Sequence, residues 1–110
     1  MIKATFYKSG DKCFENLYVG FDIKGHSGYA DAGSDIVCAS VSSMVMLFVN
    51  MADSFKIPFD FSSDEETAHI SFMSDSKDKN LSVALICFMD CVKSVSEDYP
   101  EFVEVREKKV

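Results

Sequence analysis

The sequence predicts a small α+β domain in which two helices pack on one layer of mostly antiparallel strands, with the element order ββαββαβ. Three observations favour this class. Segments with alternating apolar residues come in pairs, each pair is followed by one segment with helical periodicity, and 110 residues leave room for a single hydrophobic core. We therefore expect one domain over residues 1–110.

The chain begins with a predicted antiparallel hairpin. Residues 2–6 alternate between apolar and polar side chains, and residues 17–24 form the clearest alternating strand of the sequence. Residues 25–33 follow, with three glycines and no periodicity. We expect a loop there.

A long apolar helix is expected after this loop. Ser34 or Asp35 offers an N-cap, and the helix runs to about Ser54. No charged residue occurs between residues 36 and 52, yet this run is shorter than the ~20 residues that a bilayer requires. We interpret it as a helix that is buried on more than one side, partly at a dimer contact, and not as a membrane span.

The second half of the chain repeats the same order of elements. Residues 55–61 and 67–73 alternate again, which predicts a second hairpin with residues 62–66 as its polar connection. Apolar residues at helical spacing predict a helix from about residue 80 to residue 98. Residues 102–106 are expected to form a closing strand.

Composition argues against several classes of function. The formal net charge is −7 and no stripe of lysine and arginine is evident, which disfavours nucleic-acid binding. The first residues lack the apolar core of a signal peptide, so we expect a cytoplasmic protein with four reduced cysteines. Cys87 and Cys91 lie four residues apart on a predicted helix, and we interpret them as core packing residues and not as metal ligands. No cofactor or metal is expected.

The junction between loop and helix carries residues suited to thiol chemistry. Cys38 lies in the first predicted helical turn, where free backbone N–H groups and the helix dipole favour a thiolate and can hold an oxyanion. His26, twelve residues upstream, can accept the thiol proton. Asp35 either caps the helix or orients His26, and Ser42 stands one helical turn below Cys38. A core cysteine beside a solvated histidine is the competing interpretation.

Residues 25–30 (GHSGYA) and 33–42 (GSDIVCASVS) resemble the signature of the ribosomal-processing cysteine protease family, Prp. The element order and the Tyr99-Pro100 pair before the last strand extend the resemblance over essentially the whole chain. The resemblance implies a single peptidase domain from a family of small bacterial homodimers. These enzymes remove a short N-terminal extension from ribosomal protein twenty-seven of the large subunit, after a hydrophobic stretch that contains phenylalanine.

The same resemblance implies roles for individual residues. Cys38 matches the family nucleophile and His26 the catalytic histidine, while Gly25, Asp35 and Ser42 match other motif positions. In the empty enzyme, Cys38 and His26 can lie too far apart for a hydrogen bond without being excluded as a pair.

The loop is expected to contact the peptide. Gly28 and Gly33 can act as hinges, and Tyr29 either packs on an aromatic residue of the substrate or rests on the protein's own surface. A non-catalytic dimeric module that binds peptides or associates with ribosomes is the alternative function. The residues expected to bind substrate are Gly25, Ser27, Gly28, Tyr29 and Ser42.

Overall fold

The predicted fold class and element order are confirmed by the computed structural model, which describes residues 1–13, 16–31 and 35–110. Within these ranges the structure contains one five-stranded sheet and two helices. The elements are β1 (Ile2–Lys8), β2 (Tyr18–Lys24), α1 (Ile36–Ser54), β3 (Asp60–Asp64), β4 (His69–Met73), α2 (Lys79–Asp98) and β5 (Val103–Lys109).

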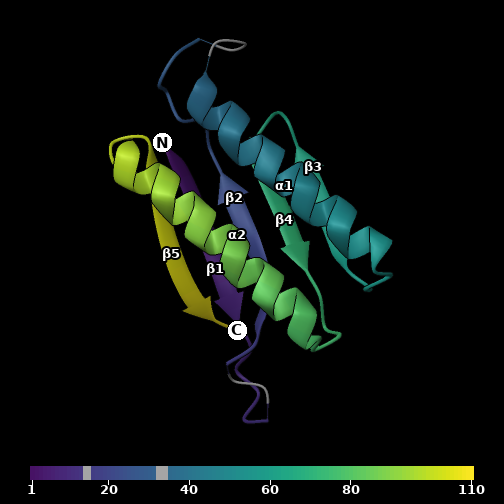
Figure 1. The fold of residues 1–110 in the computed structure, drawn as a ribbon. Coiled ribbons are helices and arrows are strands. Elements are labelled where there is room, and N and C mark those ends of the chain that lie inside the picture. Colours follow the sequence, from purple (N-terminus) through teal and green to yellow (C-terminus); the bar gives the residue numbers. More distant parts are fainter. Residues whose placement is uncertain (14–15, 32–34) are drawn as a thin grey trace.

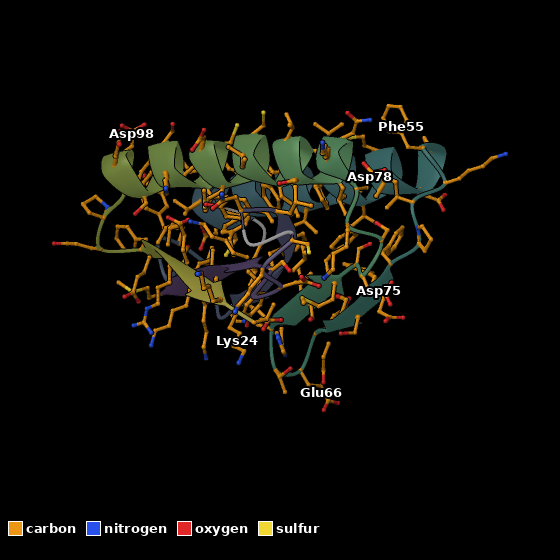
Figure 2. All side chains as sticks on the ribbon, turned by 90° about the horizontal axis from the view of Figure 1, so that it is seen from below. Lys24, Phe55, Glu66, Asp75, Asp78 and Asp98 are labelled. Carbon is orange, nitrogen blue, oxygen red and sulfur yellow. The ribbon has the colours of Figure 1, made fainter. Side chains whose placement is uncertain are left out.

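The strands lie in the order β3-β4-β2-β1-β5. All neighbouring pairs are antiparallel except β1 and β5, which run parallel. Both helices cover the same face of the sheet, with α1 nearer β3 and β4 and α2 nearer β1 and β5 (Figure 1). Lys24 marks the opposite face, which neither of the two described helices covers (Figure 2). The two predicted hairpins are therefore confirmed as strand pairs, but β2 and β4 join them into one sheet.

The bounds of β3 differ from the prediction. Residues 55–61 were expected to form this strand, whereas the structure places it at Asp60–Asp64, so that it overlaps the end of the predicted strand and extends into the predicted polar connection. Ile57 and Phe59 pack against the hydrophobic core from outside any strand, which explains the alternation that suggested one. Pairing with β4 sets the actual strand, because register is fixed by the partner and not by local pattern alone.

Phenylalanine rings join the sheet to both helices. Phe21 on β2 is fully buried, and its ring centroid lies 5.4 Å from that of Phe72 on β4 in a stacked arrangement. Phe48 of α1 and Phe88 of α2 meet the same ring edge-on, at 5.5 Å and 5.0 Å. Edge-to-face and offset-stacked geometries are those that aromatic pairs prefer. The core therefore fixes the position of both helices over the centre of the sheet.

Helix α1 is more exposed than its composition suggests. It is long and apolar enough to cross a membrane, with a mean hydropathy of 1.7 over 18 residues. Of that 18-residue stretch, 28% is buried inside the protein. One stripe at helical spacing faces the sheet, so within this chain the helix is not buried on more than one side as the sequence suggested. The buried residues of that stripe are Val37, Val41, Val45, Phe48 and Ala52.

Replacing Phe21 by alanine is expected to destabilise the protein by about 3–5 kcal/mol, because the truncation leaves a cavity between the sheet and both helices. Urea unfolding followed by circular dichroism measures this loss. Phe55→Ala is the matched control, since this ring is 71% exposed and extends from the end of α1 (Figure 2). A Phe21 variant as stable as the Phe55 variant would contradict the central position of Phe21 in the core.

Candidate active site

Asp35 caps the first turn of α1. Its backbone is extended, and its Oδ1 accepts hydrogen bonds from the N–H groups of Val37 (3.1 Å) and Cys38 (3.0 Å). Its carbonyl oxygen accepts the N–H of Ala39 at 3.0 Å. The capping alternative for Asp35 is therefore confirmed, and Ser34, the other predicted cap, lies outside the described residues. The position of Cys38 in the first helical turn is confirmed as well.

The carboxylate of Asp35 is held in its charged form. A hydrogen bond from the Ser27 hydroxyl, followed by the bond from the Cys38 backbone, lowers the pKa of Asp35 to about 2. The same carboxylate accepts the N–H groups of Val37 and Cys38. In this structure they are not free to hold an oxyanion, which differs from the expectation drawn from the sequence.

Ser27 belongs to the loop between β2 and α1, and it makes hydrogen bonds with both Cys38 and Asp35. Its side chain is buried, and its backbone N–H donates to the Cys38 Sγ at 3.3 Å. Its hydroxyl donates to Asp35 Oδ2 and accepts the N–H of Tyr29 at 3.1 Å. The sequence predicted Ser27 as a substrate contact, and this inward orientation is the main respect in which the site differs from that prediction.

Two cavities meet at Cys38, and His26, Cys38 and Ser42 line both of them. Among the described residues, no hydrogen bond joins the His26 ring to Cys38 or to Asp35. The first cavity, of about 210 Å³, is further lined by Ile2, Ile23, Gly25, Val41, Ser63, Asp64, Glu65, Ala68 and Ile70. The second, of about 520 Å³, is further lined by Gly28, Ala30, Asp35 and Ala39.

The β3–β4 hairpin contributes residues that the sequence did not single out. Asp64, Glu65 and Ile70 line the first cavity although they lie more than twenty residues from Cys38 along the chain. They arrive there because β4 pairs with β2, the strand that ends just before His26. Only the strand order could have identified them, since the charge run in this segment reads as a solvated turn.

Two predicted loop glycines occupy left-handed backbone conformations. Gly25 has φ of +91°, and a Cβ there would lie 2.5 Å from the carbonyl oxygen of Met1, so a larger residue is excluded. Its N–H donates to the carbonyl of Ala68 at 2.9 Å. Gly28 has φ of +75° with open space around it. A hinge role for Gly28 stays a prediction, and Gly33 lies outside the described residues.

Tyr29 rests on the protein's own surface in this structure. Its ring meets those of Tyr99 and Phe102 edge-on, each at 5.4 Å, while 42% of the residue stays exposed. Of the two alternatives drawn from the sequence, this agrees with a tyrosine that packs on the protein's own surface. Contact with a substrate ring stays a prediction.

The remaining cysteines lie away from the site. Cys13, Cys87 and Cys91 are free thiols on the surface, so the prediction that Cys87 and Cys91 pack in the core is wrong. The predicted helical face exists, but it is turned away from the sheet because the buried side of α2 runs through Leu85, Phe88 and Val92. Within the described ranges, no group of three or more His, Cys, Asp or Glu side chains is arranged to hold a metal ion.

Comparison with known proteins identifies a family. Residues 1–104 match the family model described as cysteine protease Prp. A ribosomal processing cysteine protease Prp from Bacillus subtilis (strain 168) is 40% identical over 50 residues, which are 46% of this chain and 41% of that protein. The protein of the same name from Mycoplasma genitalium is 27% identical over 85 residues, 77% of this chain and 84% of that one.

Solved structures share the fold. An essential ribosomal processing protease Prp from Staphylococcus aureus, in complex with a covalently linked product peptide, matches with a TM-score of 0.86 at 20% identity, covering 98% of this chain and 100% of that one. A protein from Streptococcus mutans matches with a TM-score of 0.81 at 25% identity, covering 100% and 96% of the two chains.

Replacing Asp35 by alanine is expected to lower the melting temperature at neutral pH, because two first-turn N–H groups and the Ser27 hydroxyl lose their acceptor. The folded-state pKa of about 2 lies below the unfolded value near 3.8, so this stabilisation is present above about pH 4 and is lost as pH falls towards 2. Thermal unfolding from pH 7 to pH 2 measures it. Asp35→Asn, which keeps a capping oxygen, should lose less; equal melting of parent and alanine variant at neutral pH would contradict the cap.

Proposed function

We propose that this chain, which belongs to the cysteine protease Prp family, is a cysteine endopeptidase in which Cys38 is the nucleophile and His26 its general base. One observation carries the proposal. The Cys38 sulfur lies at the start of α1, receives the backbone N–H of Ser27, and opens into cavities that His26 also lines. The thiolate is the form of cysteine that attacks a carbonyl carbon, and the imidazole of His26 is the group in these cavities suited to accept the thiol proton.

The proposed reaction follows from these groups. His26 accepts the proton of the Cys38 thiol, the thiolate attacks the scissile carbonyl carbon, and the imidazolium returns the proton to the leaving amine. Water, deprotonated by the same imidazole, then hydrolyses the thioester and releases the acyl product. His26 is exposed and not yet bonded to Cys38, so rotation of its side chain on substrate binding would complete the pair. This chemistry requires no metal or cofactor.

We propose a ribosomal protein precursor as the substrate, cleaved to remove the short N-terminal extension of ribosomal protein twenty-seven of the large subunit. Two relatives are named ribosomal processing cysteine proteases, and the Staphylococcus aureus protein binds a substrate peptide in its solved structure. The floor of the smaller cavity is apolar through Ile23, Val41 and Ile70. Such a floor suits the hydrophobic residues that precede the expected cleavage site. A cytoplasmic location follows from this substrate.

Cys38→Ala and His26→Ala are expected to abolish or strongly reduce cleavage of a synthetic peptide that spans the extension and its cleavage site. Loss of the general base costs about 10²–10⁴-fold in rate, and loss of the nucleophile removes covalent catalysis altogether. Liquid chromatography with mass spectrometry measures the cleaved fraction. Cys13→Ala and His69→Ala are the matched controls, because neither residue lines the two cavities.

The alternative of a non-catalytic peptide-binding module makes a different prediction. It expects the peptide to bind intact and Cys38 to react with iodoacetamide no faster than free cysteine. Full cleavage by either site variant would remove that residue from the proposed dyad, and no cleavage by the parent protein would favour the binding module.

We further propose that the protein is a homodimer that associates through an apolar groove between α1 and α2. The groove has a volume of about 400 Å³ and lies on the side of the helices away from the sheet. Leu47, which lines the groove, is 72% exposed, and its neighbour Met46 is 66% exposed. Exposed apolar patches of this kind mark interaction surfaces. A two-fold axis would pair this face with itself. The residues that line the groove are Met44, Leu47, Phe48, Met51, Ala84, Cys87, Phe88 and Cys91.

Leu47→Glu is expected to convert the dimer to a monomer, because pairing the two copies would bury a carboxylate in an apolar contact. Sedimentation velocity at micromolar concentration measures the change. Val110→Glu is the control, since Val110 is 58% exposed at the end of the chain and lies away from the groove. A parent protein that sediments as a monomer, or a Leu47 variant that stays dimeric, would contradict this interface.

A further inference from the structure

We infer that Ser27 is a positioning residue that holds the Cys38 sulfur and the His26 backbone in place, and that it does not contact the substrate. The inference rests on the proposed role of Cys38 as nucleophile and deepens it. Ser27 is 2% exposed, so a bound peptide cannot reach its hydroxyl without displacing the loop. All three of its observed hydrogen bonds are made within the protein: it donates to Cys38 Sγ and to Asp35, and it accepts the N–H of Tyr29.

The backbone N–H of Ser27 acts on the sulfur itself. It lies 3.3 Å from Cys38 Sγ. A neutral thiol is a weak acceptor, whereas a thiolate is a charged one, and a hydrogen bond that strengthens with ionisation favours the ionised form. Because the N–H groups of Val37 and Cys38 are engaged by Asp35, the Ser27 N–H is the backbone donor that reaches the sulfur in the described structure.

The hydroxyl of Ser27 keeps that N–H in position. It donates to Asp35 Oδ2, while Oδ1 of the same carboxylate accepts the N–H groups of the first turn of α1. One carboxylate therefore fixes both the loop that supplies the donor and the helix that carries the sulfur. Gly28 has a left-handed backbone conformation, and the next residue, Tyr29, donates its N–H to the Ser27 hydroxyl oxygen at 3.1 Å.

His26 lies between two anchored residues. On one side, Gly25 is fixed by its bond to Ala68 and by its close approach to Met1, and on the other side Ser27 is fixed by Asp35. The backbone that carries His26 is thus restrained at both ends. Approach of the imidazole to Cys38 is then expected to come from side-chain rotation more than from movement of the loop.

The rate of Cys38 alkylation by iodoacetamide, followed by mass spectrometry of the peptide that contains Cys38, tests this role without any substrate. Ser27→Ala keeps the backbone N–H but loses the hydroxyl that holds it against the sulfur. It is expected to react up to about tenfold more slowly near pH 7, the limit set by loss of one charge-assisted hydrogen bond, and at the parent rate near pH 10. The pH profile should therefore move to higher pH with an unchanged plateau. A merely structural role would change melting temperature without this displacement.

Three further variants complete the experiment. Ser40→Ala is the control, because its hydroxyl binds only the carbonyl of Ile36 on the exposed side of α1, and it should react like the parent. Ser27→Thr keeps the hydroxyl and should restore much of the rate. Asp35→Asn keeps the cap but weakens the acceptor for Ser27, so it should also slow alkylation, whereas simple removal of a nearby negative charge would speed it.

A Ser27→Ala protein with the parent's pH profile, or an Asp35→Asn protein that alkylates faster, would overturn the inference. Neither result would affect the proposed protease activity, which peptide cleavage by the parent and its loss in Cys38→Ala test separately. Should Ser27→Ala fail to fold, the threonine and asparagine variants decide the matter by the same measurement.

Discussion

The carboxylate of Asp35 is the interaction on which the candidate site depends. It joins the loop to α1, because one oxygen accepts the N–H groups of the first helical turn and the other accepts the hydroxyl of Ser27. Hydrogen bonds from both segments hold it in its charged form, and a charged acceptor makes each of those bonds stronger. The sulfur of Cys38 and the loop beside it are thereby held in one geometry.

The phenylalanine core supplies the platform for this arrangement. Phe21 stacks on Phe72 within the sheet and meets rings from both helices, which sets where α1 begins relative to the end of β2. Since His26 follows β2 and Cys38 lies in the first turn of α1, the packing of the core influences the separation of the two residues proposed as the dyad. A closely packed interior transmits small changes, so this separation is sensitive to substitutions far from the site.

One side of α1 carries apolar residues that the sheet does not cover. The helix is apolar on nearly every face, but the sheet covers only one stripe of it. Met46 and Leu47 therefore leave apolar surface exposed to water, and association with a second copy would bury this surface. The proposed dimer would account for apolar composition that exceeds the needs of the core.

The sequence by itself determined the element order, the position of Cys38 in the first turn of a helix, and the glycine-rich loop that carries His26. These features are local: alternation, helical spacing and capping residues act within a few positions of one another. Tertiary structure decided the bounds of β3, the exposure of Cys87 and Cys91, and the inward orientation of Ser27. Each of these depends on which distant segment lies alongside, and strand register, helix rotation and loop hydrogen bonds are settled only when those segments pack together.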